Sequence, residues 1–236
     1  MLADDRAVVL LSGGQDSTTC LYWAKERFKE VHALTFFYGQ RHSTEIEAAR
    51  TVAQLAGVSS HKIMQDTSLP QLVSSALLSQ DDQTALTQTR AGTELPSTFV
   101  PGRNLLFTTI ASAYAYEIGA KHVVLGVCET DYSGYPDCRE HTLRALEEAL
   151  RLGIWGELPT KPNRKHSFWL HAPLMYKTKA ETVQMAREIE GCWDALAHTV
   201  TCYTGSRAGC GACPACELRR KGFQEAGEDD PARKIH

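Results

Sequence analysis

The chain has 236 residues, of which 43% are hydrophobic and 22% are charged, and its formal net charge is −3 with neutral histidines. This composition excludes a disordered or fibrous chain, and the length suits one large domain, or one domain with a small appendage. The balance of charge provides no overall basic field for nucleic acid. The apolar runs are far shorter than the roughly 20 residues that span a bilayer, and the N-terminus lacks the pattern of an export signal. We therefore expect a cytoplasmic protein with neither a membrane nor a nucleic-acid partner.

Apolar residues alternate along the chain between strand-like and helix-like spacing. Ala7–Leu11 is a short apolar run, typical of a strand that is buried on both faces. After the polar break Ser12–Ser17, a helical spacing extends to Phe28, and Val31–Phe37 is a second predicted strand. The alternation continues with a helix from Ser43 or Thr44 to Ala56, a strand at Lys62–Met64, a helix at Asn104–Tyr116, a strand at Val123–Val127, a helix at Thr142–Leu152, a strand at Phe168–Leu170 and a helix at Thr178–Glu190. This order predicts an α/β fold with a doubly wound parallel sheet.

Two regions interrupt the alternation. Gln65–Pro101 is rich in Ser, Thr, Gln and Asp, and a connection this long is either a lid or binding loop, or a tolerated surface insertion. The second region starts at Cys192 and ends in a charged tail, Glu225–His236, for which we predict a frayed or mobile terminus. We accordingly predict a nucleotide-binding α/β domain at residues 1–191 and a small C-terminal lobe at residues 192–236.

The segment Leu11-Ser-Gly-Gly-Gln-Asp-Ser-Thr-Thr lies between the first predicted strand and the following helix. Gly13 and Gly14 lack a Cβ, so the backbone can approach a phosphate, which free N–H groups and the helix dipole stabilise. Asp16 suits such a site only with a cation between it and the phosphate, which predicts Mg²⁺ there. A plain strand-to-helix turn is the alternative. The chain contains neither G-x-x-x-x-G-K-[ST] nor G-x-G-x-x-G, so neither a P-loop kinase nor a dinucleotide site is indicated.

Four of the eight cysteines follow the pattern Cys202-x7-Cys210-x2-Cys213-x2-Cys216. Four thiolates at this spacing complete a tetrahedral zinc shell with no position left for water, which predicts a structural rather than a hydrolytic metal. An iron–sulfur cluster is the closest alternative. Cys192 lies outside the pattern, and we interpret it as a packing thiol.

Three further polar strings carry candidate binding groups. Arg41 and His42, in the string that starts at Tyr38, can meet phosphate or substrate, or can only cap the next helix. Arg103 can clamp an anion, or can form a surface salt bridge. The string Gly126–Arg139 contains tyrosines that can stack on a flat heterocycle and carboxylates that can accept its N–H groups.

The string SGGQDS resembles the PP-loop of the ATP pyrophosphatase superfamily, whose members cleave ATP between the α and β phosphates and transfer AMP to a carbonyl or carboxyl oxygen. The strings SGGQDSTTC, YGQRH, FVPGRN, GVCETDYSGYPDCR, PLM with KAE, and TCY with GCGACPAC occur in that order. Together they resemble the QueC family of queuosine-precursor biosynthesis, from Ala7 to about Arg219. The resemblance implies conversion of 7-carboxy-7-deazaguanine and ammonia to 7-cyano-7-deazaguanine by successive adenylation of carboxylate and amide. It further implies a homodimer with one structural zinc ion per chain.

The resemblance also implies where the ligands bind. It places zinc on Cys202, Cys210, Cys213 and Cys216, and ATP on Leu11, Ser12, Gly13, Gly14, Gln15, Asp16, Ser17, Thr18, Thr19, Cys20 and Leu21. From residue chemistry we expect Asp16 to hold Mg²⁺, with Arg103 and Lys179 as the other catalytic groups, facing phosphate or the substrate carboxylate. The predicted substrate contacts are Tyr38, Arg41, His42, Arg103, Glu129, Asp131, Tyr135 and Asp137.

Two alternatives stay open on the sequence. A PP-loop tRNA thiolase or another amide-forming synthetase shares the ATP loop but has a different acceptor. A thiolase needs a reactive cysteine beside the adenylated base and a basic face for RNA, and the net charge of −3 does not favour it. A zinc-ribbon binding module without catalysis is the alternative outside enzymes.

Overall fold

The computed structural model describes residues 3–39, 44–66, 68–78, 84–130, 134–157 and 168–235. Its five strands pair in parallel into one sheet, in the order β3-β2-β1-β4-β5. They are β1 (Ala3–Leu10), β2 (Phe28–Phe37), β3 (Ser60–Gln65), β4 (His122–Val124) and β5 (Trp169–His171). The order reverses on either side of β1, so the predicted doubly wound parallel sheet is confirmed.

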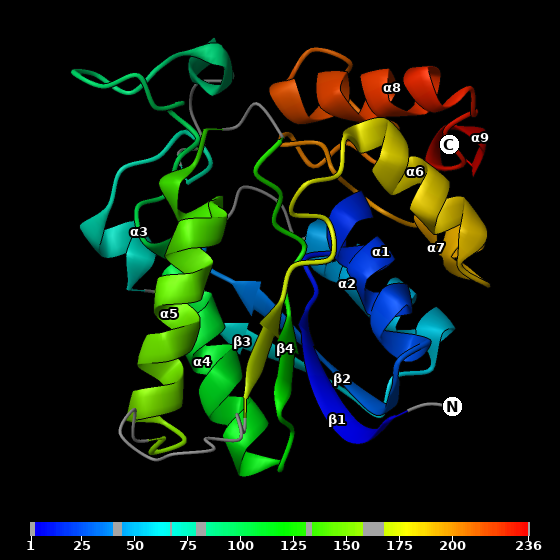
Figure 1. Cartoon of the computed structure of the whole chain (residues 1–236). Coiled ribbons are helices and arrows are strands. Elements are labelled where there is room, and N and C mark those ends of the chain that lie inside the picture. The colour runs from blue at the N-terminus through cyan, green and yellow to red at the C-terminus, as the bar shows by residue number, and fades with distance from the viewer. Residues whose placement is uncertain are drawn as a thin grey trace.

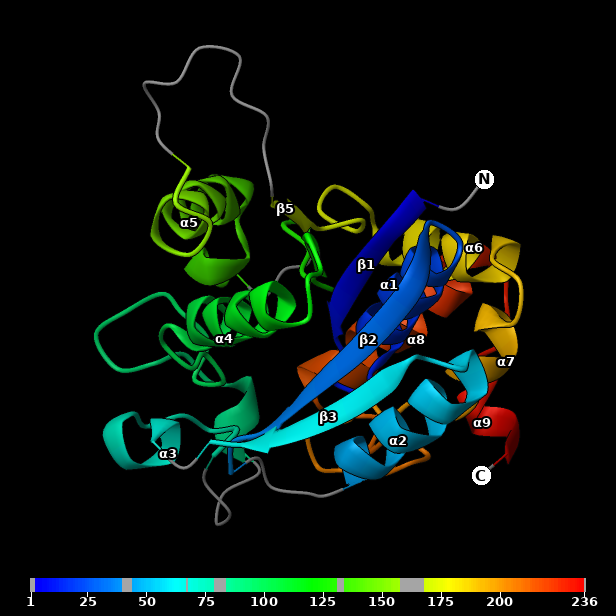
Figure 2. The same ribbon diagram turned by 90° about the horizontal axis from the view of Figure 1, so that it is seen from below.

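Helices cover both faces of this sheet. In the described part of the chain they are α1 (Gln15–Lys25), α2 (Thr44–Ala56), α3 (Leu69–Leu72), α4 (Arg103–Glu117), α5 (Glu140–Gly153), α6 (Lys179–Glu188), α7 (Cys192–Leu196), α8 (Pro214–Ala226) and α9 (Ala232–Ile235). Figures 1 and 2 show α4 and α5 on one face, and α1 and α2 on the other with α6, α7 and α8 beside them. None of the described helices combines the length and the apolar character that crossing a membrane requires.

The central strand β1 explains this two-sided arrangement. Val8 packs in one apolar cluster with Phe107 of α4, whereas Val9 packs in a second cluster with Leu21 of α1. Both valines are completely buried, because β2 and β4 pair with β1 on its two sides and helices cover its two faces. The apolar run that predicted the strand is thus a consequence of burial on both faces.

The end of the first helix differs from the prediction. Helix α1 ends at Lys25, and Phe28 begins β2 instead of continuing the helix. The chain leaves the helix because Arg27 N–H donates to the Ala24 carbonyl, which closes a tight turn. The centroid of the Phe28 ring lies 4.7 Å from that of the His122 ring on β4. Phe28 is therefore apolar because it packs within the sheet, and not because it continues the helix.

The prediction of a frayed C-terminus is wrong. Helix α8 runs to Ala226, α9 follows, and Asp230 between them is only 9% exposed. The Arg219 guanidinium donates to both carboxylate oxygens of Asp230, at 2.7 and 2.8 Å. Charged residues usually indicate a solvated terminus, but the Asp230 carboxylate is paired with Arg219 in the interior.

The C-terminal region shares a core with the sheet. Cys192, Leu196 and Phe223 belong to the same apolar cluster as Val9 of β1. Cys192 is completely buried, which confirms its interpretation as a packing thiol. The predicted division of the chain at residue 192 stays a prediction.

We expect the histidine pair between β4 and β5 to make stability depend on pH. His122 Nδ1 and His171 Nε2 lie 3.0 Å apart, and burial, followed by the neighbouring His122, lowers the pKa of His171 to about 4. In an unfolded chain the pKa of histidine is about 6.5. The neutral pair therefore contributes its full stability above pH 6.5, and this contribution is lost as the pH falls towards 4.

The variant His171→Phe keeps an aromatic ring at this position but removes the titration. Between pH 7 and pH 4.5, the free energy of unfolding from urea denaturation is expected to fall by about 2 kcal/mol less in His171→Phe than in the unmodified protein. The exposed His141→Ala serves as the control and should keep the unmodified pH dependence. Equal losses in all three proteins contradict the prediction.

Candidate active site

A cavity of about 340 Å³ lies at the carboxyl ends of β1, β2 and β4. In an open parallel sheet, ligands bind where the strand order reverses, which is at β1 in this chain. The walls come from the β1–α1 loop, the first residues of α2, α4 and α6, the loop after β4, and the segment 200–219. Regions far apart in the sequence therefore meet at the site that the sheet topology favours.

The β1–α1 loop forms one wall, and its first glycine is required by packing. The φ angle of Gly13 is +84°, and a Cβ there would lie 2.4 Å from the carbonyl oxygen of Glu45 and 2.7 Å from the amide nitrogen of Ala49. Gly14 is the N-cap of α1. Of the predicted ATP segment, Leu11, Ser12, Gly14, Gln15, Asp16 and Ser17 line the cavity, whereas Gly13, Thr18, Thr19, Cys20 and Leu21 lie behind them.

We expect Gly13→Ala to destabilise the protein by at least about 3 kcal/mol, because the new methyl group overlaps the backbone of α2 and the left-handed φ adds strain. Gly57→Ala is the matched control. Gly57 has a φ of +59° but no atom within 4 Å of the added Cβ, so it should cost only about 1 kcal/mol. Urea denaturation measures both free energies of unfolding. Equal costs contradict the role assigned to the contact with α2.

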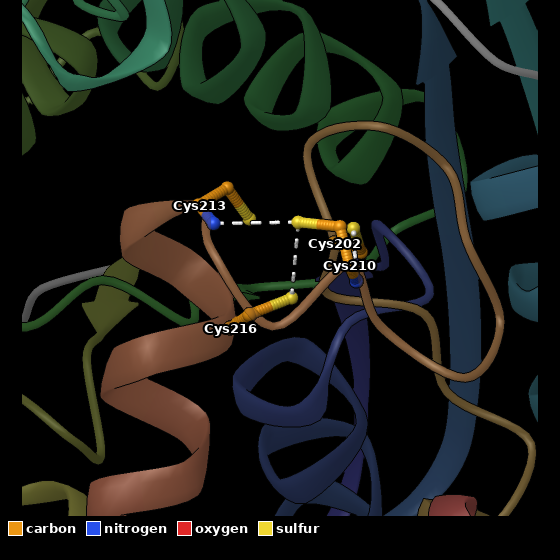
Figure 3. Close-up of side chains that lie close together, drawn as sticks. All are labelled: Cys202, Cys210, Cys213 and Cys216. Atoms are coloured by element: carbon orange, nitrogen blue, oxygen red, sulfur yellow. Dashed lines mark hydrogen bonds between the residues drawn. The ribbon is translucent and has the colours of Figure 1, made fainter. Parts of the chain in front are cut away.

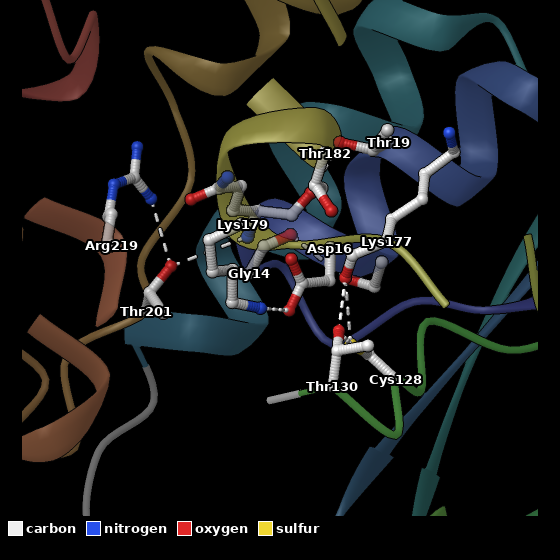
Figure 4. A network of polar contacts seen from close by, with 12 residues as sticks. Gly14, Asp16, Thr19, Cys128, Thr130, Lys177, Lys179, Thr182, Thr201 and Arg219 are labelled. Atoms are coloured by element: carbon white, nitrogen blue, oxygen red, sulfur yellow. Dashed lines mark hydrogen bonds and ion pairs between the residues drawn. The ribbon is translucent and has the colours of Figure 1, made fainter. Parts of the chain in front are cut away.

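Asp16 and Lys179 form an ion pair in the cavity wall (Figure 4). The Lys179 ammonium lies 2.5 Å from Asp16 Oδ2. Thr178 caps α6 through a reciprocal capping box with Glu181, which fixes the start of the helix that carries Lys179. Asp16 Oδ1 is buried and accepts no hydrogen bond from the described residues. One carboxylate oxygen thus meets a protein cation, and the other is left as an unused acceptor among the described residues.

Arg103 places a permanent positive charge in the cavity. It is the first residue of α4, and its Nη1 donates to the Tyr38 hydroxyl at 3.1 Å. Burial alone would lower the pKa of Arg103, but Tyr38, Tyr135 and Asp137 outweigh it and raise the pKa above its ordinary value. No carboxylate of the described residues lies within ion-pair distance of the guanidinium. A cavity that presents this charge favours an anionic ligand.

The predicted substrate contacts separate into two groups. Tyr38 and Tyr135 line the cavity, and the Tyr135 hydroxyl lies 2.6 Å from Thr98 Oγ1. Burial raises the pKa of Tyr135, so this phenol is neutral and can hydrogen-bond or stack. Arg41, His42 and Asp131 lie outside the described residues.

Asp137 and Glu129 do not line the cavity. Asp137 is buried, and its Oδ2 accepts the backbone N–H of Asn104 at 3.1 Å, in the first turn of α4. Glu129 is exposed and accepts the backbone N–H of Glu140 at 3.2 Å, where α5 starts. Both carboxylates therefore bind free N–H groups of helix N-termini in this structure.

Sequence reasoning missed several residues that line the cavity. Glu45 is among them, and burial raises its pKa to about 7. Thr201, Tyr203 and Arg219 also line it. A signal existed for these three, because Thr201 and Tyr203 flank the predicted metal ligand Cys202, and Arg219 lies about one helical turn after Cys216. Glu45 carried no such signal.

The four predicted metal-binding cysteines converge on one point (Figure 3). Their Sγ atoms all lie within 4.8 Å of one another, and the Sγ atoms of Cys210 and Cys216 are 3.9 Å apart. A tetrahedral zinc ion with Zn–S bonds of about 2.3 Å requires sulfur atoms about 3.8 Å apart. The backbone N–H of Cys213 donates to Cys210 Sγ at 3.3 Å, which suits a thiolate. The cluster therefore fits a metal ion.

The segment 65–101 contacts both the cavity and the cysteine cluster. Leu77 lines the cavity, and Ala76 and Leu86 pack in one cluster with Cys202 and Cys213. This contact favours the binding-loop interpretation over a surface insertion remote from the site. Closure of the segment as a lid stays a prediction.

Comparison with known proteins decides the family. The model of the family described as "Queuosine biosynthesis protein QueC" matches residues 6–227. The chain belongs to the QueC family. A 7-cyano-7-deazaguanine synthase of Laribacter hongkongensis is 52% identical over 227 residues, which cover 96% of this chain and 93% of the relative. The synthase of Bacillus subtilis is 47% identical over 222 residues, which cover 94% of each chain.

A solved structure supports the fold of this QueC-family chain. The crystal structure of a 4-thiouridine synthetase–RNA complex with bound ATP has a TM-score of 0.50 and 18% sequence identity to it. The match covers 98% of this chain and 52% of the synthetase chain. At this identity the likeness concerns the fold alone.

Proposed function

We propose that this QueC-family chain is a 7-cyano-7-deazaguanine synthase, which converts 7-carboxy-7-deazaguanine and ammonia to 7-cyano-7-deazaguanine at the expense of ATP. The observation that carries the proposal is the single cavity in which the β1–α1 loop, the Asp16–Lys179 pair and the Arg103 guanidinium meet. Such a cavity suits an anionic nucleotide beside an anionic second substrate. The relatives that match nearly the full chain carry this name.

The proposed reaction has two activation steps. The carboxylate oxygen attacks the α-phosphorus of ATP, which forms an acyl adenylate and releases pyrophosphate. Ammonia displaces AMP and loses a proton, which leaves the amide. The amide oxygen then attacks the α-phosphorus of a second ATP and releases pyrophosphate, which leaves the amide oxygen adenylated. The adenylated amide loses AMP, and with both N–H protons given up over this second stage the nitrile remains. Each adenylation converts a poor leaving group into AMP, and the cationic site stabilises the charge of the departing pyrophosphate.

The loop at the start of α1 is the proposed phosphate site. Gly14 and Gln15 lie at the positive end of α1, where the helix dipole stabilises an anion. Their N–H groups donate to the hydroxyls of Ser12 and Thr201, at 3.3 and 3.4 Å. Asp16 Oδ1, buried and without a described hydrogen-bond donor, is the proposed ligand of Mg²⁺, and Lys179 holds the other oxygen of the same carboxylate. Together these groups orient the phosphates and balance their charge.

Arg103 is the proposed partner of the substrate carboxylate or of the transferred phosphate. Its hydrogen bond to Tyr38 orients the guanidinium, and Tyr135 on the same wall offers an aromatic face for the flat ring. The predicted substrate contacts of Glu129 and Asp137 have no support from cavity-lining positions. Those of Arg41, His42 and Asp131, which lie outside the described residues, stay proposals.

The cysteine cluster is the proposed site of one structural zinc ion. The S–S spacing supports zinc, and four protein sulfurs leave no open coordination position. None of the eight cysteines forms a disulfide, and clustered cysteines that bind metal are typical of the reducing, cytoplasmic location that we propose. The homodimer that the family resemblance implies is part of the same proposal.

Product analysis tests the reaction. The zinc-loaded protein is incubated with ATP, Mg²⁺, ammonium and 7-carboxy-7-deazaguanine, and mass spectrometry and nucleotide chromatography follow the products. The proposal expects the nitrile together with two AMP per nitrile. AMP release only in the presence of tRNA selects a thiolase instead, and no ATP consumption with any acceptor selects a binding module.

One observation already weighs against the thiolase. A thiolase needs a nucleophilic cysteine, and both Cys128 and Cys138 line the cavity. The Cys128 thiol donates to the Lys177 carbonyl at 3.3 Å. Burial and the neighbouring Asp137 raise the pKa of Cys138 to about 12, so its thiol is protonated at neutral pH. The four clustered cysteines are occupied as the proposed metal ligands.

A further inference from the structure

Arg219 lines the cavity, but every N–H group of its guanidinium donates to a protein acceptor. Nε and Nη2 donate to the two oxygens of Asp230. Nη1 donates to Thr199 Oγ1 at 2.8 Å and to Thr201 Oγ1 at 2.9 Å. A guanidinium has five N–H donors. The fifth hydrogen bond is a longer one, from Nη2 to the Leu196 carbonyl at 3.4 Å. Arg219 is therefore saturated, and it acts on the cavity through its partners.

Of these partners, Thr201 alone lines the cavity. Figure 4 shows its hydrogen bond with Arg219. A threonine hydroxyl has two acceptor positions and one donor proton. Arg219 Nη1 occupies one acceptor position, and the backbone N–H of Gln15 approaches the other at 3.4 Å. No described residue accepts the hydroxyl proton. Both acceptor positions of the Thr201 oxygen thus receive hydrogen bonds from the protein, and its O–H proton is available to a ligand in the cavity.

The position of this hydroxyl indicates the chemistry of its ligand. Val200 N–H donates to the Gly13 carbonyl at 2.9 Å, which fixes the segment against the β1–α1 loop. Thr201 Oγ1 lies 3.9 Å from where a Cβ on Gly14 would be, at the N-terminus of α1. The helix dipole favours an anion there, and hydrogen bonds to Arg219 and Gln15 polarise the hydroxyl towards donation.

We infer that Thr201 donates a hydrogen bond to a phosphate oxygen of the bound nucleotide, and that Asp230 and Arg219 are positioning residues that orient this hydroxyl. The inference rests on the proposed nucleotide site and adds a residue from outside the β1–α1 loop. It assigns a role to the C-terminal tail, because Asp230 holds Arg219, which in turn holds Thr201. The segment after residue 192 thereby contributes directly to phosphate binding.

Thr201→Val and Thr199→Val form a matched pair. Each loses one hydrogen bond to Arg219 Nη1, but only Thr201 lines the cavity. Calorimetry on the zinc-loaded full chain with Mg²⁺ and ATP is expected to show affinity about 10- to 100-fold weaker in Thr201→Val, since a hydrogen bond to a charged group is lost. Thr199→Val should stay within about twofold of the unmodified protein, and Thr201→Ser should restore most of the affinity.

Further measurements separate binding from folding. Zinc content and thermal unfolding identify any variant that has lost its structure, and Thr201→Ala then replaces Thr201→Val. Asp230→Asn should raise the KM for ATP more than it changes kcat, because it loosens the orientation of Thr201 without touching the reacting atoms. Affinity for 7-carboxy-7-deazaguanine should be unchanged in Thr201→Val.

Two negative outcomes have different meanings. If the unmodified protein binds no ATP, the proposed function itself fails. If it binds ATP and Thr201→Val binds it equally well, or if Thr199→Val weakens ATP to the same extent, the role of the Thr201 hydroxyl is overturned while the proposed function stands.

Discussion

Asp16→Asn is expected to lower kcat for ATP-dependent turnover about 10³-fold, the scale of a lost preorganised charge in an active site. The substitution keeps the shape of the side chain but removes its negative charge. Lys179 then loses its ion-pair partner at 2.5 Å, and the proposed Mg²⁺ loses its protein ligand. Both losses occur at the proposed phosphate site, where the proposed reaction develops the pyrophosphate charge. Initial rates of AMP release measure the effect.

The dependence on Mg²⁺ distinguishes the two contributions of Asp16. Asp16→Asn should require more Mg²⁺ for half-maximal rate than the unmodified protein does. Lys179→Met should lower the rate while leaving the Mg²⁺ requirement nearly unchanged, because the ammonium contacts Oδ2 and leaves Oδ1 available. If Asp16→Asn slows turnover without changing the Mg²⁺ requirement, Asp16 acts through Lys179 alone.

Asp5→Asn is the control for the loss of one carboxylate. Asp5 lies on β1 near its amino end, away from the cavity, where it forms a 3.6 Å ion pair with Lys121. Surface ion pairs of this kind contribute little to the free energy of unfolding. Because Asp5 is also remote from the cavity, kcat should stay within about twofold of the unmodified value. Unchanged turnover in Asp16→Asn would remove Asp16 from the catalytic groups.

Cys213→Ser is expected to abolish stoichiometric zinc binding and to lower the free energy of unfolding by several kcal/mol. Structural zinc sites contribute roughly 10 kcal/mol or more to folding when the unfolded chain has no preformed site, which is comparable to the whole stability of a domain. The cysteines also lie next to residues of the cavity wall in the sequence. Cys202 directly follows Thr201, and Cys216 lies three residues before Arg219 on α8. ATP affinity should therefore fall together with metal content.

Metal analysis and thermal unfolding of the purified protein measure this result, and Cys192→Ser is the control. Cys192 is buried like Cys213 but lies outside the cluster, so its replacement carries a packing cost and should retain one zinc ion per chain. A Cys213→Ser protein that still holds one zinc ion would falsify the four-sulfur site. A metal found to be iron selects the cluster alternative instead.

The sequence was informative wherever a pattern is local. The apolar run of β1, the two glycines after it and the cysteine spacing each predicted their structure, because strand burial, loop conformation and ligand geometry depend on near neighbours along the chain. Helix α6 is a further case, since Thr178 and Glu181 form the capping box that starts it.

Predictions from local patterns were wrong for charged side chains, because such a side chain can face solvent or a ligand, or can pair with another group inside the protein. The tail was predicted to be frayed because its composition is charged, but composition does not reveal that Asp230 meets Arg219 in the interior. Glu129 and Asp137 were predicted at the substrate because their string is rich in carboxylates. In the structure they accept backbone N–H groups of α5 and α4, which sequence reasoning could not distinguish from ligand binding.

Patterns along the chain predicted the alternating strands and helices as far as α6, the loop that faces the cavity and the cluster of four cysteines, and the resemblance indicated the family. They did not predict α3, α7, α8 or α9. Which polar groups meet in the cavity wall became known from the three-dimensional arrangement alone. Asp16 and Lys179 are 163 residues apart, Tyr38 and Arg103 are 65 apart, and Thr201 reaches Gln15 across 186 residues. Such contacts have no periodicity in the sequence, because they arise from how the strands are ordered in the sheet and how the helices pack on it.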